Sequence, residues 1–296
     1  MDIAKQQMQA WTDRYWTSRD GLKLHYRDYA GPAHRPPLLM LHGLTRNSRD
    51  FENLAARYAG DWRVIAVDFR GRGLSEHDPV PARYIPRTYA ADVLQLLDEQ
   101  GIAEAVFMGT SLGGLVTMII ATVAPERIAG VLLNDIGPEL DLSGLQRIQS
   151  YLGKPVVYRD WDHAAAEFRA RHGDVHPSYG EAEWLRYAKR VARETGRGVE
   201  FDYDMKIVEP FESGNNGAVP DGWPFYRALG GRPVLVLRGG SSDLLSDAVA
   251  ERMASEIPDV EVVTVPGVGH APDLNEPEAV AGIDRLLERV LRRGSD

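Results

Sequence analysis

The sequence predicts an α/β protein in which a mainly parallel sheet carries helices on both faces. Short β-type runs alternate with helical patterns along the chain, and several of these runs are almost wholly apolar, as strands buried on both faces should be. Hydrophobic residues make up 44% of the 296 residues, which is enough for a large core. The expected strands are 22–29, 37–41, 63–68, 105–108, 130–133, 233–237 and 260–265.

Three helices between these strands have readable ends. Apolar residues recur at helical spacing from Tyr89 to Leu97, and Gly101 follows as a natural residue after a helix C-terminus. A second helix should begin after a Ser246 N-cap and end before Pro258. A third should begin at Pro277, because proline suits the first helical turn and an apolar stripe follows it.

The alternation of strands and helices stops between residues 138 and 230. This segment lacks a clear strand but shows helical patterns at 145–151, 164–170 and 181–194, with glycine and proline between them. We therefore expect a core formed by residues 1–137 and 231–296 and a helical cap formed by residues 138–230. Aromatic residues of the cap, such as Tyr151, Trp161 and Trp184, either pack the cap against the core or line an apolar substrate pocket.

Composition and charge narrow the classes of partner. The net charge is −9 and no basic patch is segregated, so nucleic acid is not expected as a partner. No secretion signal is recognisable in residues 1–17, and the apolar stretch 112–124 is shorter than the roughly 20 residues that span a bilayer. The chain has no cysteine, which excludes thiolate metal sites and a cysteine nucleophile. We expect a cytoplasmic protein that acts on a small molecule, away from membranes, and the sequence leaves a homo-oligomer open.

A candidate nucleophile lies in Gly109-Thr110-Ser111-Leu112-Gly113, the one G-x-S-x-G pattern of the chain. At average residue usage this pattern arises by chance in roughly one chain in ten of this length. The neighbouring sequence must therefore show whether the pattern marks a nucleophile. An expected strand precedes it and a helical pattern follows it, which is the strand–turn–helix setting of a nucleophile elbow. Glycines at both sides of Ser111 allow the tight turn.

A serine needs a base to accept its proton, and His270 is the best placed of the eight histidines. It follows the expected strand 260–265 in a loop with flanking glycines. His172 and His176 have the i, i+4 spacing of metal ligands, but Gly173 and Pro177 argue against a helix there. No metal site is therefore predicted.

The acid that orients the histidine should lie between the serine and the histidine in the chain. Asp243 follows the expected strand 233–237 in a loop that contains two glycines, and it is the predicted acid. Asp135 follows the expected strand 130–133 and is the alternative acid, although the chain there is expected to leave for the cap.

An oxyanion hole requires two preorganised donors, one of them the backbone N–H after the nucleophile. Leu112 supplies the first. The second is predicted at Leu44, because Gly43 permits a sharp turn after the strand 37–41. His42 is interpreted as a side chain that braces this turn rather than as a second base.

Together these motifs resemble the α/β-hydrolase superfamily, in its capped esterase, lactonase and carbon–carbon hydrolase branch. The resemblance covers roughly residues 20–136 and 232–292, and implies a mostly parallel eight-stranded sheet, a helical cap after the sixth strand and no cofactor. The residues that carry it are His42-Gly43, Asp68 with Arg70-Gly71-Arg72-Gly73-Leu74-Ser75, Gly109 to Gly114, Ser242-Asp243 and Gly269-His270.

Departures from related branches narrow the expected chemistry. Ser111 stands where epoxide hydrolases and haloalkane dehalogenases have an aspartate, and no cysteine is available for a dienelactone hydrolase. Residues 44–48 lack the glycine-rich run of many carbon–carbon hydrolases. The sequence predicts a serine hydrolase that cleaves a small to medium carboxylic ester or lactone through an acyl-enzyme. The alternatives are a carbon–carbon bond hydrolase acting beside a ketone, of the meta-cleavage-product type, and a ligand receptor without turnover.

Overall fold

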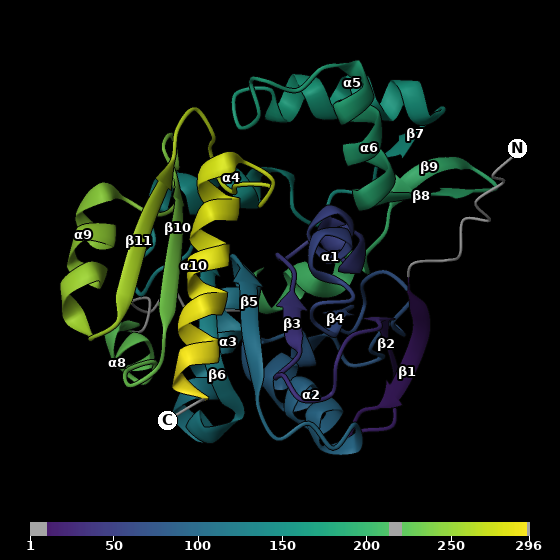
Figure 1. Cartoon of the computed structure of the whole chain (residues 1–296). Helices are drawn as coiled ribbons and strands as arrows, with labels where there is room; N and C mark the ends of the chain where they lie inside the picture. The colour runs from purple at the N-terminus through teal and green to yellow at the C-terminus, as the bar shows by residue number, and fades with distance from the viewer. Residues whose placement is uncertain (1–10, 213–220, 295–296) are drawn as a thin grey trace, which may run out of the picture.

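An eight-stranded sheet forms the centre of the computed structural model, which describes residues 11–212 and 221–294 (Figure 1). The strand order is β1-β2-β4-β3-β5-β6-β10-β11; β1 and β2 pair antiparallel, β2 pairs antiparallel with β4, and the remaining pairs are parallel. This confirms the predicted fold class. The strands are β1 (Thr12–Thr17), β2 (Lys23–Tyr29), β3 (Leu38–Leu41), β4 (Val64–Val67), β5 (Ala105–Thr110), β6 (Ile128–Asn134), β10 (Val234–Gly239) and β11 (Val260–Val265).

Helices cover both faces of this sheet. Because side chains alternate along a strand, Leu39 and Leu41 of β3 enter one core cluster while Leu38 and Met40 enter the other. The first cluster packs against α2 (Pro86–Glu99), α3 (Leu112–Val123), α8 (Trp223–Arg227) and α9 (Asp247–Glu256). The second packs against α1 (Glu52–Tyr58) and α10 (Pro277–Arg293), which crosses the front of the sheet in Figure 1.

The predicted strands and helices lie where the sequence placed them, apart from their ends. Ser246 is the N-cap of α9 and accepts a hydrogen bond from the Val249 N–H, as predicted. The strand β1 was not predicted, because Trp16 is its one buried side chain and an exposed edge strand lacks apolar alternation. The short 3₁₀ turns of the core are η1 (Ser48–Phe51), η2 (Pro81–Arg83) and η3 (Pro125–Arg127).

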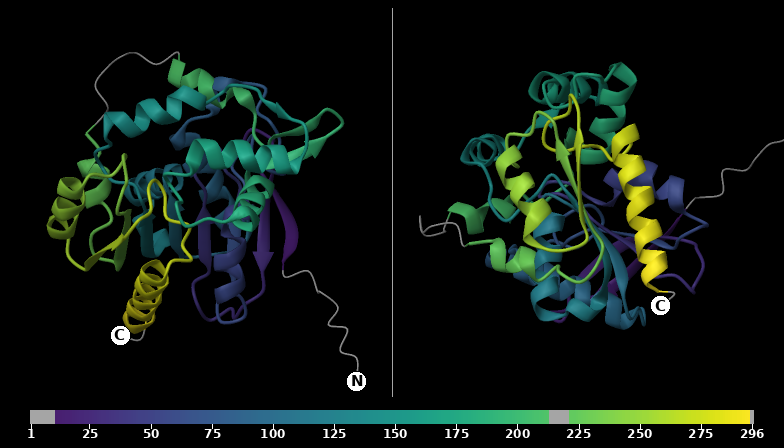
Figure 2. Two further views of the ribbon diagram at one scale, coloured as in Figure 1. Left: turned by 90° about the horizontal axis from the view of Figure 1, so that it is seen from above. Right: turned by 60° about the vertical axis from the view of Figure 1, so that its left-hand side comes forward.

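The cap follows β6, as predicted, and lies over one end of the sheet in Figure 1 and in both views of Figure 2. It is not wholly helical. Its elements are α4 (Leu142–Tyr151), β7 (Val157–Tyr158), α5 (Trp161–His172), α6 (Glu181–Val191), β8 (Ala192–Thr195), β9 (Gly198–Phe201), η4 (Met205–Val208) and α7 (Glu209–Glu212). The strands form a small antiparallel sheet in the order β7-β9-β8, and runs of two to four residues are too short for a periodicity argument to detect.

The chain rejoins the core earlier than the expected boundary at residue 230. Trp223 and Tyr226 of α8 are buried in the main core cluster, and the Tyr226 hydroxyl donates to the Met253 carbonyl of α9 at 2.8 Å. The expected boundaries 1–137, 138–230 and 231–296 therefore need a shift at the second junction. Residues 1–10, which belong to the stretch 1–17 without a recognisable secretion signal, lie outside the described residues.

Polar contacts hold the cap on the core beside the sheet. The Asn47 side chain donates to the Arg190 carbonyl at 2.8 Å, and Arg49 pairs with Asp202 at 2.7 Å. The backbone N–H of Gly73 also donates to the Asp202 carbonyl at 3.1 Å. The cap is thus tied to the core loops that follow β3 and β4. In residues 11–212 and 221–294, no helix combines the length and apolarity needed to cross a bilayer.

Candidate active site

Ser111 lies in a strained turn between β5 and α3. Its φ of 50° and ψ of −114° place a non-glycine residue in a region that side chains rarely adopt. The Ser111 N–H donates to the Asn134 carbonyl of β6 at 3.0 Å, and the Ser111 carbonyl accepts from the Gly114 N–H at 2.9 Å. A strained backbone of this kind persists only where surrounding contacts hold it, and it is typical of functional sites. The sharp turn exposes the serine side chain at the edge of the sheet.

The glycines around this turn are required by close contacts. A Cβ added to Gly113 would lie 2.0 Å from the Leu41 carbonyl oxygen, and one added to Gly109 would lie 2.4 Å from the Gly114 nitrogen. The helix α3 therefore begins directly against β3 and β5. The small residues predicted around the serine are needed because any side chain there would push the turn off the sheet.

His270 contacts both Ser111 and Asp135. Its Nε2 lies 3.1 Å from the Ser111 Oγ, and its Nδ1 lies 2.7 Å from the Asp135 Oδ2. A carboxylate only accepts hydrogen bonds, so Nδ1 carries the ring proton and Nε2 is left to accept the serine proton. The side chain of Asp135 is fully buried and that of His270 is 9% exposed.

Asp135 meets His270 because of the strand order. The strand β6 lies between β5, which Ser111 follows directly, and β10, so a residue just after β6 lies between the serine turn and the histidine loop. The Asn134 side chain donates to the Pro272 carbonyl at 2.9 Å and holds that loop at the end of β6. Asp135 itself has a φ of 53°, which turns its side chain out of the strand direction.

The predicted acid Asp243 does not contact His270, and this prediction is wrong. The Asp243 carboxylate instead pairs with Arg147 of α4, at 2.5 Å to Nε and 2.8 Å to Nη2. The loop after β10 does reach the site, but it presents Ser242, whose Oγ donates to the Asp135 Oδ2 at 2.6 Å. The alternative acid, Asp135, is the residue that the structure brings to the imidazole.

The carboxylate of Asp135 is held by the end of β10 and by the loop that follows it. Its Oδ1 accepts the Gly239 N–H at 2.7 Å, while Oδ2 accepts both Ser242 and His270. Ser242 in turn accepts the N–H groups of Leu244 and Leu245 at 3.2 Å and 3.1 Å. The contact between Ser242 and Asp135 was not predicted from the sequence, although the place of Ser242 in a strand-end loop beside the predicted acid was a usable signal.

The loop after β3 has an orientation that suits an oxyanion donor. The Gly43 carbonyl accepts the Arg46 N–H at 3.2 Å and lies 2.7 Å from the His42 Nδ1. In a trans peptide the next N–H points opposite to this carbonyl, so the Leu44 N–H is turned away from these donors. It donates to no other residue within 11–212 and 221–294. Leu112 is the first residue of α3 and has no acceptor for its N–H within the helix.

His42 braces this loop, as interpreted from the sequence. Its Nε2 accepts the Phe69 N–H at 3.1 Å, which leaves Nδ1 protonated to donate to the Gly43 carbonyl. Burial lowers the pKa of His42 to about 4, because the charged imidazolium would lose its hydration. The ring is therefore neutral at neutral pH, and both its nitrogen atoms are engaged.

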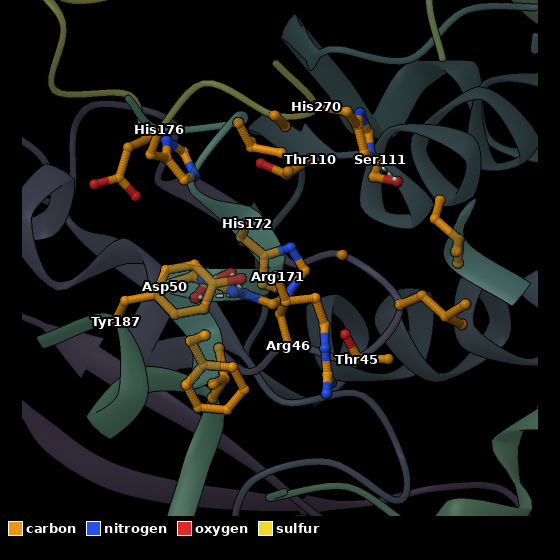
Figure 3. Close-up of a pocket in the computed structure, with 18 of the residues that line it drawn as sticks. Thr45, Arg46, Asp50, Thr110, Ser111, Arg171, His172, His176, Tyr187 and His270 are labelled. Carbon is orange, nitrogen blue, oxygen red and sulfur yellow. Dashed lines mark hydrogen bonds and ion pairs between the residues drawn. The ribbon is translucent and has the colours of Figure 1, made fainter. Parts of the chain in front are cut away.

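A pocket opens beside Ser111 and His270, between the core and the cap. Figure 3 shows these two side chains at one side, with Arg46, Arg171, His172 and Tyr187 among the other lining residues. The Arg46 Nε donates to both carboxylate oxygens of Asp50, at 2.9 Å and 2.7 Å, and its guanidinium lies 4.5 Å from the Tyr187 ring centroid. The lining thus combines aromatic surface with charged groups.

The aromatic residues of the cap take both roles left open by the sequence, and some take both at once. Tyr151, Phe168 and Tyr187 line the pocket, and Phe168 and Tyr187 also contribute to the cluster inside the cap. Trp184 is buried in this cluster and does not line the pocket, and Trp161 packs against the same cluster. The cap therefore has its own small core and lends a subset of its aromatic side chains to the pocket.

The fold and this arrangement are those of an α/β-hydrolase, and comparison with known proteins gives the same class. Residues 38–283 match the family model described as the alpha/beta hydrolase family. The chain belongs to this family, as the sequence motifs predicted.

Three relatives place the chain among hydrolases. It is 33% identical to a 3-hydroxybutyrate-oligomer hydrolase from Cupriavidus necator over 88% of this chain and 90% of that protein. It is 28% identical to a 2-(acetamidomethylene)succinate hydrolase from Mesorhizobium japonicum, over 82% and 84% respectively. The crystal structure of an alpha/beta hydrolase from Novosphingobium aromaticivorans has 52% identity and a TM-score of 0.90, over 95% of this chain and 99% of that one. These relatives support hydrolase chemistry for this chain.

Proposed function

We propose that this protein is a serine hydrolase that cleaves a small to medium carboxylic ester or lactone through an acyl-enzyme. One observation carries the proposal. Asp135, His270 and Ser111 form a continuous line of hydrogen bonds, 2.7 Å and 3.1 Å long, that ends in a pocket. This is the arrangement of acid, base and nucleophile by which a serine hydroxyl is activated.

The proposed reaction begins with attack of the Ser111 Oγ on the substrate carbonyl. The His270 Nε2 accepts the serine proton as the new carbon–oxygen bond forms, and Asp135 stabilises the resulting imidazolium through Nδ1. The N–H groups of Leu44 and Leu112 then hold the negative oxygen of the tetrahedral intermediate.

The intermediate collapses when the carbon–oxygen bond to the alcohol breaks. His270 returns its proton to the departing alcohol, which leaves an ester between Ser111 and the acyl group. A water molecule then attacks this ester, again with His270 as base, and the free acid and the serine hydroxyl are restored. For a lactone the alcohol and the acid stay in one molecule.

Ester chemistry is also supported by a relative. The 3-hydroxybutyrate-oligomer hydrolase of Cupriavidus necator, 33% identical over most of both chains, is named for an oligomer whose units are joined by ester bonds. The pocket of this chain is lined by Tyr151, Tyr187 and Phe168, which offer apolar contact to a short acyl or hydroxyacyl unit.

A Ser111→Ala substitution tests the proposal. We expect wild type to release para-nitrophenol from short-chain esters and to be labelled by a fluorophosphonate, because only an activated serine attacks that phosphorus centre. Ser111→Ala should lose the label and reduce kcat on the order of 10⁴-fold or more. Ser255→Ala, an exposed serine on α9, is the matched control.

Two results would refute the proposed function. Undiminished labelling of Ser111→Ala would place the nucleophile elsewhere. Binding of esters and lactones by wild type with less than one turnover per chain would indicate a ligand receptor, and turnover of a vinylogous diketone but of no ester would indicate a carbon–carbon hydrolase.

A further inference from the structure

The pocket beside Ser111 adjoins a second pocket on the cap. The two share Arg147, Tyr151, Arg171 and His172 as lining residues, and the second is also lined by Lys154. Three cationic side chains thus line the second pocket, and two of them, Arg147 and Arg171, also line the pocket beside Ser111. They come from α4, from the loop after it and from α5.

The charges in this second pocket are incompletely neutralised. Arg147 pairs with Asp243, as described above. Within residues 11–212 and 221–294, neither Arg171 nor Lys154 has a carboxylate oxygen within 4.0 Å, and Lys154 instead donates to the Ser150 carbonyl. Arg171 is exposed at the pocket wall. Two cations are therefore available to a ligand.

His172, which lines both pockets, is exposed to the charges of the same arginines. Its pKa is lowered to about 3, first by burial and then by the charges of Arg46, Arg171 and Arg147. A cluster of cations disfavours one more positive charge and favours a negative one at the same place.

Resting on the proposed function, we propose that the basic pocket formed by Arg171, Lys154 and Arg147 binds a free carboxylate of the substrate. The substrate class is then an ester that carries a carboxylate on its acyl part or on its alcohol part, several bonds from the scissile carbonyl. A guanidinium binds a carboxylate through two parallel N–H donors, so Arg171 is a specificity-determining residue that fixes the distance between this carboxylate and Ser111.

The test compares pairs of substrates that differ in one charge. On the acyl side, mono-para-nitrophenyl adipate is compared with its neutral carboxamide analogue. On the alcohol side, gamma-acetoxybutyrate is compared with gamma-acetoxybutyramide by acetate release. The readout is the ratio of kcat/KM for the anionic substrate to that for the neutral one, measured for wild type and for Arg171→Gln combined with Lys154→Gln.

Wild type should prefer the anionic member of one pair by at least about tenfold, and the double variant should lower that ratio about tenfold to a hundredfold, mainly through KM. Arg171→Lys should retain part of the preference, and added salt should reduce it in wild type. Arg169→Gln is the control, because Arg169 is exposed on the same helix and lines neither pocket.

The substrate pair in which wild type prefers the anionic member identifies the part of the substrate, acyl or alcohol, that carries the carboxylate. The inference is overturned if wild type prefers neither anionic substrate, or if the double variant keeps the wild-type ratio. Failure of the proposed function gives a different result, because wild type would then hydrolyse neither member of either pair, whereas failure of the present inference leaves both members hydrolysed.

Discussion

Asp135 follows β6 and Asp243 follows β10, and the direction of each side chain decides which of them contacts His270. Both follow strands that pair with each other, and Leu237 of β10 lies opposite Asn134 of β6. Asp135 is fully buried against His270, whereas the side chain of Asp243 is 33% exposed and pairs with Arg147. Two carboxylates close in space thus have different partners and different predicted roles.

Asp135→Asn should reduce kcat on the order of 10⁴-fold while the protein stays folded, because an amide favours the wrong imidazole tautomer. Asp243→Asn should cost less than about tenfold, because it weakens only a half-exposed ion pair. The measurements are steady-state ester hydrolysis and circular dichroism of both variants. A larger kcat loss in Asp243→Asn would restore Asp243 as the acid.

The sequence predicted that Ser111 and His270 lie together but not that Asp135 contacts the imidazole, for a physical reason. Ser111 and His270 each lie in a local pattern of glycines after a strand, which a linear sequence displays directly. The choice between Asp135 and Asp243 depends on which of two adjacent loops turns its side chain inward. That choice is made by contacts distant in sequence, such as the hydrogen bond between Asn134 and Pro272.

At the scale of elements, the close approach of α3 to β3 positions the serine. The Gly113 position leaves no room for a side chain, because an added Cβ would lie 2.0 Å from the Leu41 carbonyl oxygen, a backbone atom that cannot rotate away. The prediction of a strand–turn–helix around Ser111 was confirmed because this packing demands a glycine pattern visible in the sequence. The three-stranded sheet of the cap had no such pattern.

Gly113→Ala should therefore destabilise the fold by about 1–3 kcal/mol or more, because the helix must move off the sheet to admit the methyl group. Gly196→Ala is the matched control, since an added Cβ at that position meets no atom within 4 Å. Urea unfolding followed by tryptophan fluorescence gives both free energies of unfolding. Equal free energies of unfolding for the two variants would show that α3 can move away from β3 without loss of stability.

At the scale of the whole molecule, buried imidazoles make stability depend on pH. The pKa is lowered to about 4 in His42 and His176 and to about 3 in His172, in each case first by burial. An unfolded histidine has a pKa of about 6.5, so the unfolded chain binds more protons below that pH. The stabilisation from neutral histidines is present above about pH 6.5 and is lost as the pH falls toward 4.

His42 is the sharpest test of this linkage, because its ring is fully buried under the loop that carries Leu44. Its neighbours act in both directions, since Asp68 and the Gly43 carbonyl raise its pKa while Arg72 lowers it, but burial is the largest effect. A single group of this kind makes the protein about 2 kcal/mol less stable at pH 5 than at pH 7.5. Asp92 acts oppositely, because burial raises its pKa to about 6 and the fold then gains stability as that carboxyl is protonated.

His42→Gln should thus flatten the dependence of the free energy of unfolding on pH between about 7.5 and 5, whatever its effect on stability at neutral pH. Glutamine cannot take up a proton in the unfolded chain, so the wild-type slope should fall by the contribution of one group. His34→Gln, at an exposed histidine, should leave the slope unchanged. The measurement is urea unfolding at four pH values across this range. Parallel curves for wild type and His42→Gln would show that the proton released on folding comes from another group.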